Sequence, residues 1–301
     1  MRLFMHNLSD VEHFLVSEEI MARAYSLSTA DERAWMKKQI AHLCAEFAPK
    51  ELHIREESRR SNGFHSSFKR SGPLEFTGLI LNRALPAWNK ILALLVPAVM
   101  HKTSRIGVFI QDTDPEDIPR ELLTALELAG IEDIYCLKNN DLLLSLPALD
   151  QCMRSVFFHF SAQPLEQSGQ ENRINWLDGQ GTTFNLFSKS ILKAGIWAGT
   201  DLNWNWKILT WANPDVTFMV AGENAWQAPQ HFELLTMNRD DFLNLDMDVF
   251  YGPMEDFGRS RAFLGLSPGM EACWVWPGLD SSLFTVRREF WGDLSESESR
   301  T

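Results

Sequence analysis

Several features are scarce in this 301-residue chain, and each scarcity excludes a class of function. Basic residues number 28 against 40 acidic ones, which leaves a formal net charge of −12. A phosphate backbone is bound through a basic face, so we expect no nucleic-acid partner. The longest uninterrupted apolar run, from Ile91 to Met100, contains a proline and is too short to span a bilayer. No membrane partner is therefore expected either.

Cysteines and targeting signals are scarce as well. The chain has four cysteines, widely separated and without a Cys-x-x-Cys pair: Cys44, Cys136, Cys152 and Cys273. This spacing suggests neither a zinc knuckle nor a disulfide framework. No charged-then-apolar segment with a small-residue cleavage site opens the chain. We therefore expect a cytoplasmic protein.

A helix–strand–helix–strand pattern is the most informative part of the sequence. Apolar residues from Leu85 to Leu95 recur at helical spacing, and the run Ile106–Ile110 is typical of a buried parallel strand. Residues 118–129 again have helical spacing, and Gly130 follows where a helix C-terminus favours positive φ. Ile131–Leu137 completes a strand–helix–strand crossover, the unit of an α/β domain with a parallel sheet.

Two later runs, around Phe158 and Phe218, are also short, continuous and apolar. Strands of parallel sheets are buried on both faces and therefore show such runs. We predict that Val108, Ile134, Phe158 and Phe218 lie on neighbouring, mostly parallel strands.

The first 74 residues carry no evident chemistry. Residues 1–57 are predicted to be helical, with capping-box composition at Ser9–Glu12 and again at Ser28–Glu32. Residues 58–74 form a break rich in Ser, Gly and Arg. This break is interpreted as a solvated linker, with a mobile lid for an anionic ligand as the alternative.

Two further features have open interpretations. The tryptophans at positions 197, 204, 206 and 211 could form an aromatic ligand platform, although large aromatic residues more often pack in cores and interfaces. Cys273 could be a nucleophile, although a lone cysteine in an apolar run is more often a packed small hydrophobe.

Three segments occur in an order that is known from one family. They are Val96–Tyr135, then Ala228–Glu233 with the sequence Ala-Pro-Gln-His-Phe-Glu, and then Val249–Pro253. They resemble histidinol dehydrogenase and, more distantly, the aldehyde dehydrogenase superfamily. The resemblance implies an α/β fold with mostly parallel sheets, flanking helices and an N-terminal helical segment.

The resemblance also implies catalytic positions. The family carries Ala-Pro-Glu-His-Leu-Glu, whose Glu-His pair supplies the acid and base groups for oxidation. This chain keeps the histidine as His231 and has Gln230 at the glutamate position. A glutamine cannot accept a proton, whereas an imidazole can act as a base near neutral pH.

NAD is the cofactor that the resemblance implies. The candidate cofactor-binding residues are Asp112, after the first predicted strand, and Asn139 and Asn140, where the family has a Gly-Gly pair. The chain has no Gly-x-Gly-x-x-Gly, so the usual phosphate fingerprint is absent.

No metal site is expected. The family holds zinc through ligands that include an aspartate and a histidine near the C-terminus. Arg259 stands at the aspartate position, and no histidine follows His231. A metal needs several correctly placed ligands, so the sequence predicts a zinc-less site.

Two functions follow from this interpretation. One is a histidinol-dehydrogenase-like, NAD-linked oxidoreductase with a degenerate site; the alternative is a non-catalytic member of the fold that binds a small molecule or a protein partner. A homo-oligomer is also considered. The predicted segments are an N-terminal helical segment and linker (1–74), a nucleotide-binding-like domain (75–163), a second α/β domain (164–291) and a disordered tail (292–301).

Overall fold

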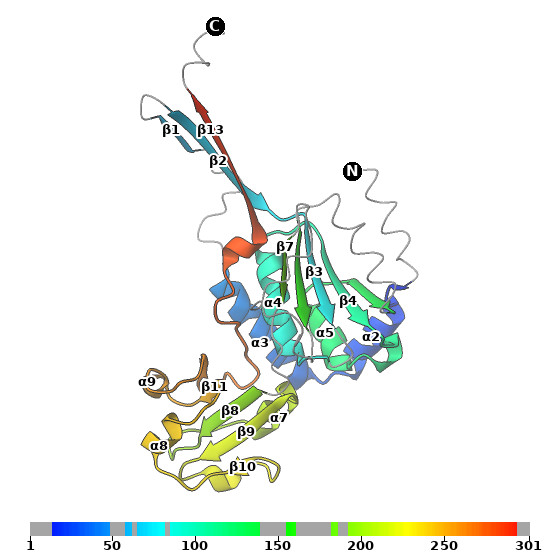
Figure 1. Cartoon of the computed structure of the whole chain (residues 1–301). Coiled ribbons are helices and arrows are strands. Elements are labelled where there is room, and N and C mark those ends of the chain that lie inside the picture. Colours follow the sequence, from blue (N-terminus) through cyan, green and yellow to red (C-terminus); the bar gives the residue numbers. More distant parts are fainter. Residues whose placement is uncertain are drawn as a thin grey trace.

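Two parallel sheets form the frame of the molecule (Figure 1). The computed structural model describes residues 14–48, 58–61, 65–81, 85–138, 155–160, 182–185 and 192–293. The predicted α/β class, with mostly parallel sheets and flanking helices, is confirmed. No helix within these ranges is both long and apolar enough to cross a membrane.

The first sheet has the strand order β5-β4-β3-β6-β7, and all its strands are parallel. Its strands are β3 (Phe76–Leu81), β4 (Ile106–Gln111), β5 (Asp133–Leu137), β6 (Ser155–Phe160) and β7 (Thr182–Asn185). Val108 pairs with Ile134, as the crossover pattern predicts. Strand β3 lies between β4 and β6, and no sequence pattern had predicted it.

Four helices cover one face of the first sheet. They are α2 (Glu18–Leu27), α3 (Ala30–Glu46), α4 (Trp88–Met100) and α5 (Arg120–Leu128). Helix α3 begins at a capping box formed by Thr29 and Glu32, and Gly130 after α5 has φ +73°, so both predictions are confirmed. Helix α4 was predicted to bury one face. Instead every side chain from Trp88 to Ala98 is buried, because a second layer of the chain packs on its outer side.

The second sheet has the order β10-β9-β8-β11-β12 and is also parallel. Its strands are β8 (Leu192–Trp197), β9 (Val216–Ala221), β10 (Glu233–Leu234), β11 (Val249–Tyr251) and β12 (Leu264–Leu266). Short helices accompany them: α7 (Trp206–Ala212), η3 (Ala225–Gln227), α8 (Arg239–Leu243) and α9 (Met254–Phe257). Phe218 lies on β9, so its predicted place beside Val108 is wrong. An apolar run indicates a buried strand, but it does not say which sheet the strand joins.

A three-stranded antiparallel arm extends from the body of the molecule (Figure 1). It consists of β1 (Ser58–Ser61), β2 (His65–Pro73) and β13 (Thr285–Asp293), preceded by η4 (Ser281–Phe284). The predicted linker at 58–74 is therefore largely strand, and residues 292 and 293 of the predicted tail belong to β13. Pairing with a strand more than two hundred residues away overrides the local turn composition.

One hydrophobic core joins the two sheets. It runs from the helix-covered face of the first sheet through α4 to one face of the second sheet, and it includes Leu79, Leu92, Ile208 and Val220. The opposite face of the first sheet carries a separate, mainly aromatic cluster. The predicted domain boundary at 163/164 lies outside the described residues, and β7, beyond that boundary, belongs to the first sheet.

Candidate functional site

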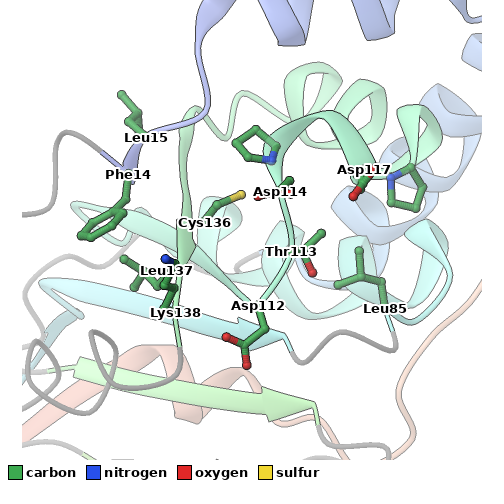
Figure 2. Close-up of a pocket in the computed structure, with 12 residues that line it drawn as sticks. Phe14, Leu15, Leu85, Asp112, Thr113, Asp114, Asp117, Cys136, Leu137 and Lys138 are labelled. Carbon is green, nitrogen blue, oxygen red and sulfur yellow. The ribbon is translucent and has the colours of Figure 1, made fainter.

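A cavity of about 820 Å³ lies at the carboxyl ends of β4 and β5 (Figure 2). We call it the first-sheet cavity. Open parallel α/β sheets bind their ligands outside the carboxyl ends of the strands, so its position in the fold is that of a ligand site. Its lining residues are Phe14, Leu15, Leu85, Asp112, Thr113, Asp114, Pro115, Asp117, Pro119, Cys136, Leu137 and Lys138.

The turn after β4 presents Asp112 in a fixed conformation. The residue has φ +50°, a left-handed conformation that Asp tolerates better than most residues. Its backbone N–H donates to the Leu137 carbonyl over 2.9 Å, which ties the turn to β5. The Thr113 hydroxyl donates to the Gln111 carbonyl over 3.1 Å. In Figure 2 the Asp112 carboxylate points away from Asp114 and Asp117.

The N-terminal segment forms one wall of the cavity. Leu15 makes an antiparallel bridge with Tyr135, and the Val16 N–H donates to the Ile134 carbonyl over 2.8 Å. This pairing covers the edge strand β5, which would otherwise expose unpaired backbone groups. Phe14 packs on the aromatic cluster of the first sheet. A segment remote in sequence therefore completes the site.

Carboxylates dominate the charge of the first-sheet cavity. Its described lining includes three aspartates, Asp112, Asp114 and Asp117, and a single cation, Lys138. Carboxylates accept strong hydrogen bonds from hydroxyl, amide and amine donors, and they repel phosphate groups. The cavity therefore suits a ligand that offers hydroxyl or amine donors where it meets the aspartates.

Cys136 brings a thiol, not a thiolate, to this cavity. Burial, together with the negative charge of Asp114, raises the pKa of Cys136 to about 11. The thiolate is the nucleophilic and metal-binding form of cysteine. At neutral pH Cys136 is therefore a small, weakly polar wall residue.

We expect slow alkylation of Cys136. Its modification by iodoacetamide near neutral pH should be roughly 10²-fold slower than that of an exposed cysteine, because so little thiolate is present. The rate should rise about tenfold for each pH unit up to the raised pKa. Peptide mass spectrometry after timed exposure measures this site alone. The chain unfolded in urea is the control, and equal rates for folded and unfolded protein would contradict the expectation.

The start of α4 is filled by the chain itself. In dinucleotide-binding folds the pyrophosphate lies at the N-terminus of the helix that follows the first strand. Here Asn89 and Lys90 are 0% and 1% exposed. The Asn89 amide donates to Asn213 Oδ1 over 3.1 Å, and the Trp276 indole N–H donates to the Lys90 carbonyl over 2.9 Å. Within the described residues, the start of α4 therefore offers no open position for a pyrophosphate.

The predicted site residues occupy different parts of the structure. Asp112 lines the first-sheet cavity, while Asn139 and Asn140 lie outside the described residues. Gln230 and His231 are exposed on the loop between η3 and β10, and the His231 ring packs edge-on against Phe232 at 4.7 Å. Neither lines the first-sheet cavity. The structure does not bring them together with Asp112, and their catalytic role stays a prediction.

A second cavity, of about 830 Å³, lies at the carboxyl ends of β8, β9 and β11. Glu223 and Arg239 are among the residues that line it, whereas Gln230 and His231 are not. We call it the second-sheet cavity. It collects side chains from the loops that follow these strands.

The positions considered for a metal and a nucleophile have other roles. Arg259 forms an ion pair with Asp240, and within the described ranges no three His, Cys, Asp or Glu side chains are grouped to hold a metal ion. Cys273 is fully buried, and burial raises the pKa of its thiol to about 11. The packing interpretation of Cys273 is confirmed.

Most of the residues that line the first-sheet cavity were not predicted from the sequence. Asp114 and Asp117 follow Asp112 closely, so a cluster of acids after a predicted strand was the available signal. Phe14 and Leu15 gave no such signal, because their contacts with β5 span more than a hundred residues.

No family model and no curated protein matches the chain. Among solved structures, it is similar to histidinol dehydrogenase from Elizabethkingia anophelis, with 12% identity, a TM-score of 0.53, and coverage of 98% of this chain and 81% of that one. It also aligns with a NAD-dependent benzaldehyde dehydrogenase from Corynebacterium glutamicum (9% identity, 98% and 82% coverage, TM-score 0.48). A third is succinate-semialdehyde dehydrogenase from Burkholderia pseudomallei (8% identity, 97% and 89% coverage, TM-score 0.46). At such an identity the likeness to histidinol dehydrogenase shows the fold alone, an α/β fold with parallel sheets.

Proposed function

We propose that the first-sheet cavity binds the adenosine half of NAD and that the chain acts as a nucleotide-binding member of this fold. The Asp112 carboxylate is the observation that carries this proposal. It follows β4, the second strand of a β3–α4–β4 unit, and its turn is tied to β5. In dinucleotide-binding βαβ units an acidic residue of this kind accepts hydrogen bonds from the ribose hydroxyls.

The charge of the cavity selects among nucleotides. NADP carries a phosphate on the ribose hydroxyl that Asp112 would bind, and a carboxylate repels it. The described residues offer no cradle for the pyrophosphate either, since the start of α4 is buried. Adenosine itself should therefore keep most of the affinity of NAD.

An NAD-linked oxidoreductase is the second candidate. The exposed imidazole of His231 favours it, because a substrate could reach this base, with Gln230 orienting a group beside it. The residues that line the first-sheet cavity do not include His231, so the binding function has the stronger support. We propose that zinc has no part in either function, since Arg259 is paired with Asp240.

Calorimetric titration with NAD, NADP and adenosine tests the proposed function. Asp112→Asn should weaken NAD roughly 10- to 100-fold, because it removes a hydrogen bond to a charged group. Asparagine also adopts the left-handed conformation, so this variant keeps the turn. Asp246→Asn, an exposed carboxylate outside the cavity, is the matched control. Equal NAD affinity for wild type and Asp112→Asn, or tighter binding of NADP than of NAD, would refute the proposal.

A further inference from the structure

Three tryptophans line a third pocket, of about 510 Å³, which we call the tryptophan pocket. It shares no residue with the first-sheet cavity. Its lining combines α3, the start of α7 and the loop after β12, and consists of Trp35, Asn203, Trp204, Asn205, Trp206, Lys207, Gly269 and Glu271. Two of the four tryptophans that the sequence left open between packing and ligand binding, Trp204 and Trp206, are therefore in this pocket.

Packing holds the indole rings in place. The Trp204 indole N–H donates to the Trp197 carbonyl over 3.1 Å, and its ring lies edge-on to Tyr251 at 6.0 Å. The Trp206 ring lies edge-on to Phe232 at 6.2 Å. These contacts fix the rings before any ligand arrives, which lowers the entropy lost on binding.

A buried carboxylate stands in the wall of the tryptophan pocket. Glu271 is 1% exposed. Its Oε1 accepts a hydrogen bond from the Asn205 N–H over 3.1 Å, whereas its Oε2 is buried and without a hydrogen-bond partner in the described part of the chain. A buried carboxylate oxygen without a partner is costly, so a compensating positive charge nearby would stabilise the site.

Two cations of the chain lie at this pocket: the exposed Lys207 lines it, and Lys38 lies over the ring of Trp35. The Lys38 ammonium lies 4.8 Å from the centre of the Trp35 ring and donates a hydrogen bond to the Gly269 carbonyl. Cations are attracted to the face of an indole ring by its quadrupole. The face of Trp35 therefore already holds a cation, and an external cation would have to displace Lys38 from it.

We propose that the tryptophan pocket binds a small organic cation of the methylated ammonium class. Methyl groups pack against indole rings, and the spread positive charge interacts with the ring faces. The unpaired Oε2 of Glu271 lies behind the pocket surface, so it acts through its charge and requires no N–H donor from the ligand. A quaternary ammonium, which has no N–H to donate, matches this arrangement. This proposal is independent of the nucleotide site.

Titration with choline tests the proposal, with tryptophan fluorescence and calorimetry as readouts. We expect saturable binding with a Kd on the order of 1 mM, typical of partly exposed cation–π sites. The uncharged analogue 3,3-dimethylbutan-1-ol has the same shape, and it should bind at least about tenfold more weakly. Equal binding of both compounds, or no saturable choline binding, would overturn the proposal.

Four variants localise the site. Trp206→Leu and Glu271→Gln should each weaken choline binding roughly tenfold, with the glutamine keeping the acceptor for Asn205. Lys38→Met removes the resident cation from Trp35 and should strengthen choline binding about two- to fivefold, an effect that misfolding would not produce. Trp226→Leu is the control, because Trp226 is exposed and lies outside the pocket. Loss of binding in Trp226→Leu, or unchanged binding in both Trp206→Leu and Lys38→Met, would overturn the proposal.

Discussion

Asp215→Ala is expected to lower the free energy of unfolding by about 3 kcal/mol, because it leaves a buried charge without its partner. Lys90 on α4 is 1% exposed, its ammonium pairs with Asp215, and it lies 4.7 Å from the centre of the Trp274 ring. Breaking a buried ion pair typically costs roughly 3–5 kcal/mol. The Asp215 side chain is 30% exposed, which favours the lower end of that range.

The deficit should depend on pH. Burial lowers the pKa of Lys90, while the charge and hydrogen bond of Asp215 raise it. Without Asp215 the folded-state pKa falls further below the unfolded value of about 10.4. Between these two values the unfolded chain binds more protons, so stability rises with pH. The loss in Asp215→Ala should therefore be largest near neutral pH and shrink as pH approaches the unfolded value.

Urea unfolding of wild type and Asp215→Ala, at neutral and at mildly alkaline pH, measures both effects. The double variant Lys90→Met/Asp215→Ala is the matched control. It should recover much of the lost stability, since an apolar side chain replaces the unpaired ammonium. A deficit in Asp215→Ala that is below about 0.5 kcal/mol, or that grows with pH, would contradict the ion-pair account.

The second large effect that we expect concerns activity: the protein should oxidise histidinol no faster than the background rate. The resemblance places a glutamate of the acid/base pair at Gln230, and an amide cannot accept the proton. Loss of a positioned base lowers a rate by about 10²–10⁴-fold, and loss of an electrophilic metal adds to that. Arg259, which the resemblance places at the position of a zinc-binding aspartate, forms an ion pair with Asp240.

Turnover is measured by adding histidinol and NAD and following the absorbance of the reduced cofactor. Elemental analysis of the same sample measures its zinc content. Any slow background oxidation should proceed at the same rate in His231→Ala. An unchanged rate would show that His231 does not catalyse it. Robust turnover that His231→Ala abolishes would make the chain a working oxidoreductase. One chelation-resistant zinc per chain would equally reject the zinc-less site.

Local signals in the sequence were sufficient for part of the fold. The crossover from β4 through α5 to β5, the positive φ of Gly130 and the cap of α3 all depend on residues close in sequence. The remaining parts of the fold depend on pairing between segments that are far apart in the sequence. The arm exists because β13 pairs with β2, and Phe218 belongs to the second sheet because β8 and β10 flank its strand.

The candidate sites show the same division. Asp112 could be chosen because it follows a recognisable strand, but the wall formed by Phe14 and Leu15 could not. The ion-pair partner of the buried Lys90 is Asp215, 125 residues away. The tryptophan pocket is lined by Trp35 of α3 together with Trp204, and no spacing in the sequence predicts that they share a pocket.

A crystal structure of the protein with NAD tests the central claim most directly. The account predicts the adenosine half in the first-sheet cavity, with its ribose hydroxyls within hydrogen-bonding distance of the Asp112 carboxylate. Adenosine bound instead beside His231 or in the second-sheet cavity, with the first-sheet cavity vacant at saturating NAD, would contradict it.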